Sequence, residues 1–106
     1  MIKLGVPYSE LNTQLDIVNT REDEAVAFAA GVELAGKESY IYIQDDGLLN
    51  CLNAFTTLLI PYNIPIFISV YSRKDNLEHH KVATELAGKL CQILGQKTLS
   101  TAFFNL

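Results

Sequence analysis

Short apolar segments recur along this chain of 106 residues and are separated by longer segments with helical patterning. Four of the short segments are bounded by Gly, Pro, Asn, Asp or Ser, and two of them are rich in β-branched and aromatic residues, which is typical of strands. We predict strands over 1–6, 15–19, 39–44 and 66–71. A fifth segment, 98–104, is predicted to form an edge strand.

The segment after the second predicted strand is rich in Ala and predicts a tightly packed helix. Thr20 and Asp23 resemble a capping box at its start. The helix is expected to run to about Ala35, with Gly36 as its C-terminal stop. Ser9 could begin a further short helix that ends at Gln14.

Two more helices are predicted in the second half of the chain. Residues 48–59 carry no charge, which indicates a helix that is buried on more than one side. Asn50, Asn53 and Thr56 recur near helical spacing and favour a subunit interface on one face of it. Residues 81–94 place apolar side chains at helical spacing, with polar residues opposite: Val82, Ala83, Leu86, Ala87, Leu90, Cys91 and Leu94.

The alternation of strands and helices predicts an α/β fold with a parallel, twisted sheet in a single domain, 1–106. Right-handed crossovers are expected to place helices on both faces of that sheet. Ligands of such sheets bind beyond the carboxyl ends of the strands. The connections 19–23, 44–50 and 72–80 are predicted to meet there.

Composition excludes several classes of function. The net charge is −4 with no basic stripe, so nucleic-acid binding is not expected. No apolar run reaches the length of a membrane span. Cys51 and Cys91 are isolated and lack metal-ligand spacing, so we interpret both as buried thiols in a reducing, cytoplasmic compartment.

Three groups of residues carry candidate chemistry. Glu22 begins the Ala-rich helix, where it either satisfies the helix dipole or reaches into a cleft and binds a ligand's ring nitrogen. Residues 45–47 are predicted to form a loop after the third strand, and Asp45 and Asp46 form either a solvated pair in it or part of a ligand site. His79 and His80 precede the last helix, and their spacing from the acids does not support a metal site.

Several segments, in order and at matching spacing, resemble the pyrimidine-binding domain of thiamine diphosphate-dependent decarboxylases. The likeness is to the sulfopyruvate and phosphonopyruvate decarboxylase group and covers nearly the whole chain. The charged loop 75–80 takes part in it, and His80 fits the family's histidine slightly better than His79. The other segments are 4–9, 22–31, 34–37, 44–50 and 60–66.

This resemblance implies a role for each matched residue. Glu22 would hydrogen-bond a ring nitrogen of the aminopyrimidine and activate the cofactor. Gln44, Asp45 and Asn50 would take part in binding thiamine diphosphate, while Asp46 and His80 would lie on the substrate side. The family's diphosphate and Mg²⁺ site uses a Gly-Asp-Gly run followed by Asn, and no segment here fits it. A separate diphosphate-binding partner subunit is therefore expected.

The expected protein is the pyrimidine-binding subunit of a split 2-oxo acid decarboxylase, active only with its partner, as a homodimer or a heterotetramer. The family usually has Asn-Ser-Gly-Leu-Gly-Asn where this chain has Asp-Asp-Gly-Leu-Leu-Asn at 45–50. The segment 9–22 of this chain is also shorter than the corresponding segment of the family. These departures predict a changed substrate or a lost activity. A non-catalytic, shortened binding or regulatory module, or a self-associating dimer, is the alternative. A flavodoxin-like ligand-binding domain unrelated to thiamine ranks last.

Overall fold

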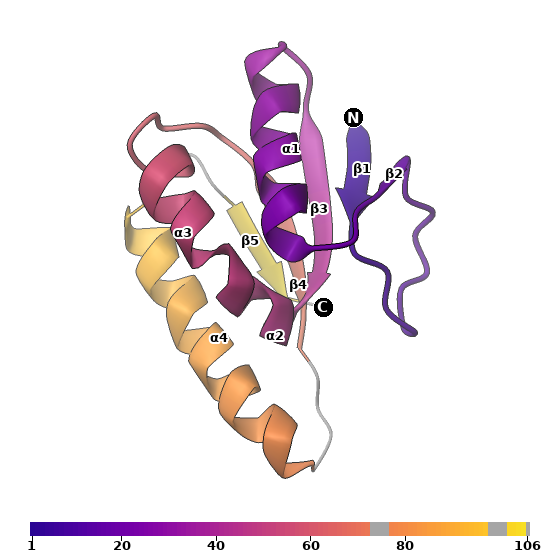
Figure 1. The fold of residues 1–106 in the computed structure, drawn as a ribbon, viewed down its shortest axis with the longest axis vertical. Helices are drawn as coiled ribbons and strands as arrows, with labels where there is room; N and C mark the ends of the chain where they lie inside the picture. The colour runs from indigo at the N-terminus through magenta and orange to yellow at the C-terminus, as the bar shows by residue number, and fades with distance from the viewer. Residues whose placement is uncertain (73–76, 98–101, 106) are drawn as a thin grey trace.

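The computed structural model describes residues 1–72, 77–97 and 102–105, and they form a five-stranded sheet in the order β2-β1-β3-β4-β5 (Figure 1). Every neighbouring pair of strands is parallel, which confirms the predicted α/β class. The last strand is found at 102–105, while 98–101 lie outside the described residues. The strands are β1 (Ile2–Gly5), β2 (Ile17–Val18), β3 (Ser39–Gln44), β4 (Phe67–Tyr71) and β5 (Ala102–Asn105).

One row of apolar side chains crosses the sheet and forms the floor of the core. Leu4 is in register with Ile41, Ile41 with Ile68, and Ile68 with Phe103. The first three are fully buried, and Phe103 stacks on Phe55 with 5.9 Å between ring centroids. Burial of several such side chains, at roughly 1.5–3 kcal/mol each, is the main force that holds the helices on the sheet.

Helix α1 (Glu22–Leu34) begins close to where the sequence predicts it and ends one residue early. Gly36 follows with φ of +87°, a conformation that glycine adopts without strain, so it acts as the predicted stop. The predicted capping box is wrong, because Arg21 is the N-cap residue and its side chain makes no capping hydrogen bond. Ala25, Val26, Ala29 and Ala30 form its buried side.

Residues 45–59 wind in three different ways. They comprise α2 (Asp45–Leu48), the 3₁₀ turn η1 (Leu49–Cys51), α3 (Leu52–Ala54) and the π-helical turn η2 (Phe55–Leu59). The prediction of a loop at 45–47 is wrong, since α2 starts at the residue that follows β3. The hydroxyls of Thr56 and Thr57 both donate to the carbonyl of Asn53, at 3.1 and 2.7 Å. Such bonds compete with regular helical pairing.

Helix α4 (Glu78–Lys97) is longer than the predicted 81–94 and includes His80 in its first turn. Ala87 and Leu94 are buried as predicted, whereas Val82 and Leu86 are exposed, at 63% and 49%. The predicted short helix at 9–14 is also absent, because this part of the chain forms turns. No helix in the described residues is long and apolar enough to cross a membrane.

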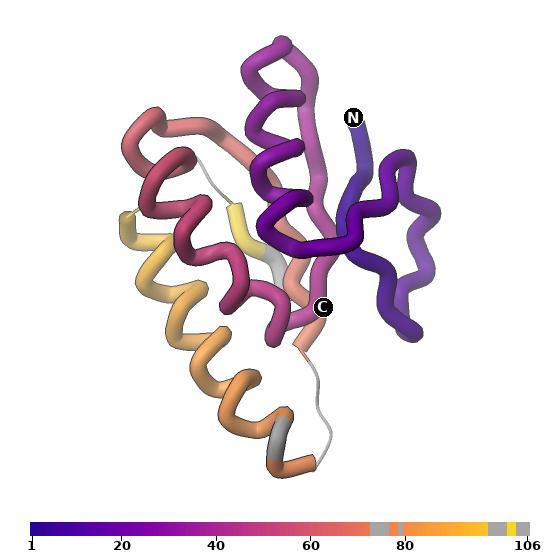
Figure 2. The backbone as a smooth tube through the Cα atoms, viewed as in Figure 1, coloured from indigo at the N-terminus to yellow at the C-terminus, as the bar shows by residue number. Residues whose placement is uncertain are grey.

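The described helices all cover the same face of the sheet (Figures 1 and 2). The connections β2 to β3, β3 to β4 and β4 to β5 advance across the sheet in one direction, so right-handed crossovers put their helices on one side. The connection from β1 to β2 runs the opposite way and contains no helix in the described structure. The expected second layer of helices is therefore missing from the described residues, which corrects that part of the fold prediction.

Candidate functional site

Glu22 lies at the first turn of α1 and packs against the backbone of α2. A Cβ atom built on Gly47 would overlap Cγ of Glu22 and would lie 2.7 Å from its Cδ. Any other residue at position 47 would thus displace the carboxylate or the turn. Glycine at this position is what allows the side chain of Glu22 to lie flat against the connection that follows β3.

One oxygen of the Glu22 carboxylate is held in place and the other is not. Nδ2 of Asn50 donates to Oε1 at 3.2 Å. Within the described part of the chain, no hydrogen bond is made to Oε2. Glu22 is half-buried in the first turn of α1. The side chain is therefore oriented by Asn50 and Gly47 and keeps one oxygen for a ligand donor.

The two acids that follow Glu22 are turned toward other partners. Asp23 forms an exposed ion pair with the guanidinium of Arg21, with an N–O distance of 3.1 Å. Oε1 of Glu24 accepts from the side chain of Asn19 at 3.2 Å and from the backbone N–H of Thr20 at 3.4 Å. Of the three carboxylates in this turn, Glu22 is the one packed against Gly47 and Asn50.

Asp45 and Asp46 are the first two residues of α2, a helix that packs against α4. Asp45 is only 3% exposed, and its Oδ1 accepts the backbone N–H of Asp46 at 2.8 Å. Burial, with a smaller contribution from the charge of Asp45, raises the pKa of the Cys91 thiol on α4. Asp45 is thus a buried acid between two helices, which differs from a solvated loop residue. Asp46 is half-buried.

The remaining predicted residues are spread around the same end of the sheet. Gln44 is the last residue of β3, and alternation along the strand assigns it to the face without helices. His80 is half-buried in the first turn of α4, where its backbone N–H donates to the carbonyl of Leu77. The side chain of His79 and residues 73–76 lie outside the described structure. The structure brings Glu22 and Asn50 together, and it places Gln44 on a different face from α1.

The prediction that Cys51 is a buried thiol is confirmed, whereas Cys91 is half-buried, and sequence reasoning did not place the Cys51 thiol beside this site. Its Sγ is 3.5 Å from the carbonyl oxygen of Gly47, to which it donates a weak hydrogen bond. Burial, followed by the charges of Glu22 and Asp23, raises the pKa of Cys51 to about 12. The thiol is therefore neutral at physiological pH. The sequence did carry a signal for this contact, because residues four apart in a helical segment, such as Gly47 and Cys51, lie on the same side of the helix.

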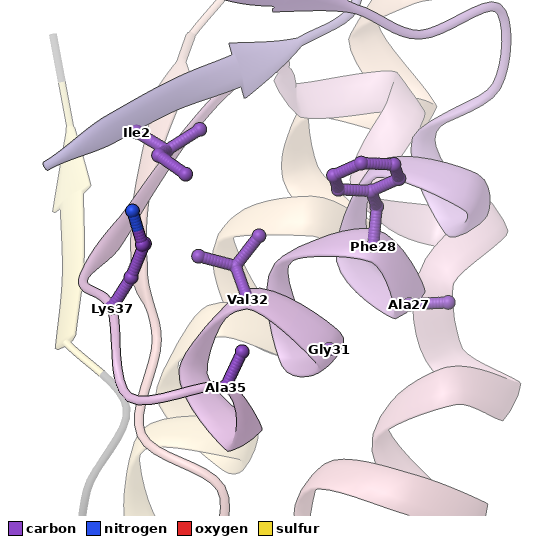
Figure 3. A pocket seen from close by; sticks show the side chains of 7 residues that line it. All are labelled: Ile2, Ala27, Phe28, Gly31, Val32, Ala35 and Lys37. Atoms are coloured by element: carbon purple, nitrogen blue, oxygen red, sulfur yellow. The ribbon is translucent and has the colours of Figure 1, made fainter.

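A separate apolar groove of about 450 Å³ lies along the outer side of α1 (Figure 3). Phe28 and Val32 project into it from the helix, Ile2 closes it from β1, and Lys37 lies at its rim. Phe28 is 46% exposed. Among the described residues, no group of three or more His, Cys, Asp or Glu side chains is placed to hold a metal ion.

Comparison with known proteins supports the resemblance seen in the sequence, although no family model matches the chain. The chain is 34% identical to sulfopyruvate decarboxylase subunit alpha of Methanococcus maripaludis over 81 residues, which are 67% of this chain and 48% of that protein. Against the subunit of the same name from Methanothermobacter thermautotrophicus it is 36% identical over 80 residues, with 66% and 48% covered.

A third relative is a phosphonopyruvate decarboxylase, the other enzyme named in the resemblance. The chain is 39% identical over 82 residues to phosphonopyruvate decarboxylase of Streptomyces hygroscopicus, covering 70% of this chain and 20% of that protein. The chain thus spans about half the length of the alpha subunits that it matches. Similarity to the sulfopyruvate and phosphonopyruvate decarboxylase group is confirmed, while the match to a pyrimidine-binding domain stays a prediction.

Proposed function

We propose that this chain is the pyrimidine-binding subunit of a split, thiamine diphosphate-dependent 2-oxo acid decarboxylase. The observation that carries the proposal is the Glu22 carboxylate, which Asn50 orients and Gly47 accommodates while Oε2 remains available. Similarity to sulfopyruvate decarboxylase alpha subunits supports the class of enzyme and the need for a second subunit.

The donor set fits an aminopyrimidine ring. A half-buried carboxylate with one available oxygen can accept, and share, a proton with a ring nitrogen. Asn50 fixes the rotation of the carboxylate, so that Oε2 need not reorganise when the ring arrives. When bound, the cofactor supplies the electron-accepting thiazolium that allows carbon dioxide to leave the substrate.

The acids at the start of α2 favour a substrate with a single negative charge. Asp45 is buried and Asp46 is half-buried at the same strand end as Glu22. A substrate with a sulfonate or phosphonate beside its carboxylate would be repelled by them unless a cation of this chain or of the partner neutralised them. In this proposal the partner chain holds the diphosphate and its Mg²⁺, and the assembly contains two copies of each chain.

A reconstitution experiment tests the proposal. The chain is mixed with the second subunit of the Methanothermobacter enzyme, in place of its own alpha subunit. Thiamine diphosphate binding is measured by calorimetry with Mg²⁺, and carbon dioxide release is measured from pyruvate and from sulfopyruvate. We expect binding only in the mixture and faster release from pyruvate. Glu22→Gln should lower turnover by about 100-fold or more, because the amide cannot take up a proton.

Glu24→Gln is the matched control, because Glu24 is a neighbouring acid that bonds to Asn19 and Thr20. It should leave turnover within about twofold of the parent chain. Turnover that is unchanged by Glu22→Gln would overturn the assignment of the catalytic residue. Absence of cofactor binding in a mixture that does form a complex would instead establish the non-catalytic, shortened module.

A further inference from the structure

A small pocket lies at the carboxyl end of the sheet, between the start of the connection from β1 to β2 and Tyr71, the last residue of β4. In Figure 1 this connection extends past the arrowhead of β1. We propose that this pocket, which we call the tyrosine pocket, binds a small organic ammonium ion. It is lined by Tyr8, Glu10, Leu11, Asn12, Thr13 and Tyr71.

The tyrosine pocket is formed by backbone that is fixed at several points. The backbone N–H of Leu11 donates to the carbonyl of Tyr8 at 3.0 Å and closes a turn. Further along, Asp16 accepts the backbone N–H of Lys3 through Oδ2 and donates its own backbone N–H to the carbonyl of Lys3, both at 2.8 Å. Because these bonds are present before a ligand arrives, the pocket needs little ordering to receive an ion.

Two aromatic rings form one wall of the tyrosine pocket. Tyr8 and Tyr71 stack with 5.2 Å between ring centroids and 22° between ring planes, and both are half-buried. The face of an aromatic ring is negative and attracts a cation that lies within about 6 Å of its centroid. The wall therefore favours a positively charged group that also brings apolar surface.

Glu10 supplies a negative charge that no residue in the described part of the chain neutralises. Its carboxylate is exposed and makes no ion pair or hydrogen bond with the described residues. Burial, followed by the charges of Tyr42, Tyr71 and Glu10, raises the pKa of the Tyr8 phenol, so this carboxylate lies near the aromatic wall. Among the lining residues that the structure describes, none is Lys, Arg or His, and the whole chain has a net charge of −4. An anion is therefore disfavoured and a cation is attracted.

The donor groups of the tyrosine pocket suit an organic cation better than a metal ion. A hard metal ion takes about six or more oxygen ligands, whereas a single carboxylate lines this pocket. The side chains of Asn12 and Thr13 make no hydrogen bond with the described residues, and both can donate and accept. They are therefore available to bind a hydroxyl or N–H group of the same ligand.

The size of the tyrosine pocket favours a free ion that enters whole. Its volume is about 340 Å³, near the lower limit for sites that bind small molecules. It shares no lining residue with the site around Glu22, so this inference does not depend on the proposed function. An ammonium headgroup that is part of a lipid presents the same chemistry, and the experiment separates these two sources.

A titration of the full chain with choline tests the proposal. Choline has a quaternary ammonium group and a hydroxyl, and 3,3-dimethylbutan-1-ol is its uncharged isostere. Amide chemical shifts are recorded at constant ionic strength, because added salt screens exposed charges. We expect saturable shifts at residues 8–13 and Tyr71, with a dissociation constant of about 1–10 mM for choline and at least about fivefold weaker binding of the alcohol.

Variants of the lining residues separate the carboxylate from the aromatic wall. Glu10→Gln keeps the size of the side chain and removes its charge, so it should raise the dissociation constant of choline by about fivefold or more. Glu38→Gln is the matched control, because Glu38 is an exposed acid that does not line the pocket and its loss changes the net charge equally. Tyr71→Leu should also weaken binding by about fivefold, whereas Tyr71→Phe retains the ring and should stay within about twofold of the parent chain.

Several outcomes would overturn the proposal. Equal binding of choline and its uncharged isostere, or equal effects of Glu10→Gln and Glu38→Gln, would show that the pocket does not recognise the charge. Shifts confined to residues outside the tyrosine pocket, or no shift at millimolar choline, would place no ammonium site here. Phosphatidylcholine vesicles form the second arm. Co-sedimentation of the chain with these vesicles, without shifts from free choline, would assign the site to a lipid headgroup and overturn binding of a free ion.

Discussion

The two faces of strand β3 differ in what covers them. Ser39, Ile41 and Ile43 are buried beneath the helices, while Tyr40 and Tyr42 lie half-exposed on the opposite face of the sheet. Side chains alternate between the two faces of this strand, so one face contributes to the buried core and the other stays partly exposed. The comparison shows that, among the described residues, the fully buried core lies on one side of the sheet.

The largest expected effect separates the two faces directly. Ile41→Ala should lower the free energy of unfolding by about 2–5 kcal/mol, because it leaves a cavity in the buried row. Tyr40→Ala, one residue earlier, should cost about 1 kcal/mol when measured at low protein concentration. Urea denaturation of both variants gives the values. Equal losses would show that the face of β3 opposite the helices is as fully packed as the core.

Alkaline pH should lower the free energy of unfolding through a thiol buried on the helix-covered side of the sheet. The pKa of Cys51 is raised to about 12 from 9.0, so above pH 9 the unfolded chain loses this proton more readily than the folded one. Stability from this thiol is complete below pH 9 and is lost as the pH rises toward 12, with an upper limit of about 4 kcal/mol.

Cys51→Ala should flatten this pH dependence, as measured by denaturation between pH 8 and pH 11. Tyr8, Tyr40 and Cys91, whose pKa values are also raised, act in the same direction and will leave a residual slope. An identical slope in the variant would show that the Cys51 thiol ionises as easily in the folded chain as in the unfolded one.

Substitutions of two glycines compare the packing beside Glu22, at Gly47, with that on the exposed side of α1, at Gly31. Gly47→Ala should cost about 1–3 kcal/mol and displace Glu22, because the new methyl group overlaps its Cγ. Gly31→Ala should stabilise the chain by about 0.5–1 kcal/mol, since nothing lies within 4 Å of its added methyl group. Thermal unfolding of both variants measures the difference, and a neutral Gly47→Ala would contradict the close packing.

The smallest expected effect concerns the hydrogen bond that orients Glu22. Asn50→Ala removes the donor to Oε1 and should lower stability by about 0.5 kcal/mol, because Asn50 is exposed. Asn53→Ala, an exposed neighbour, is the control. The side-chain carboxyl resonance of Glu22 should move in the first variant alone. A shift of equal size in both would show that Asn50 does not orient the carboxylate.

Much of this architecture could be predicted from local patterns. The β-branched segment at β3 and the apolar segment at β4 predict their strands, and Gly36 ends α1 as expected. The one-sided arrangement of the helices could not be predicted, because it depends on strand order and on a connection after β1 that contains turns in place of a helix. Strand order is a property of long-range pairing, which periodicity does not report.

Sequence reasoning named Glu22 and Asn50 as candidate site residues but did not predict the packing around them. Glu22 and Asn50 are joined by a hydrogen bond, as a shared site requires, although their roles toward a cofactor stay predictions. The contacts of Glu22 with Gly47 and of Cys51 with Gly47 depend on α2 starting directly after β3. A pair of acids followed by glycine favours a loop locally, whereas the structure begins α2 at Asp45 and buries that residue.

The changing pitch of residues 45–59 has one more consequence. A backbone that passes from α to 3₁₀ and then to π winding can gain or lose a residue between β3 and β4 without shifting either strand. Length variation in this segment would rotate a different side chain toward Glu22 and leave the sheet unchanged. Relatives with altered ligand preference are therefore expected to differ here in spacing as well as in residue type.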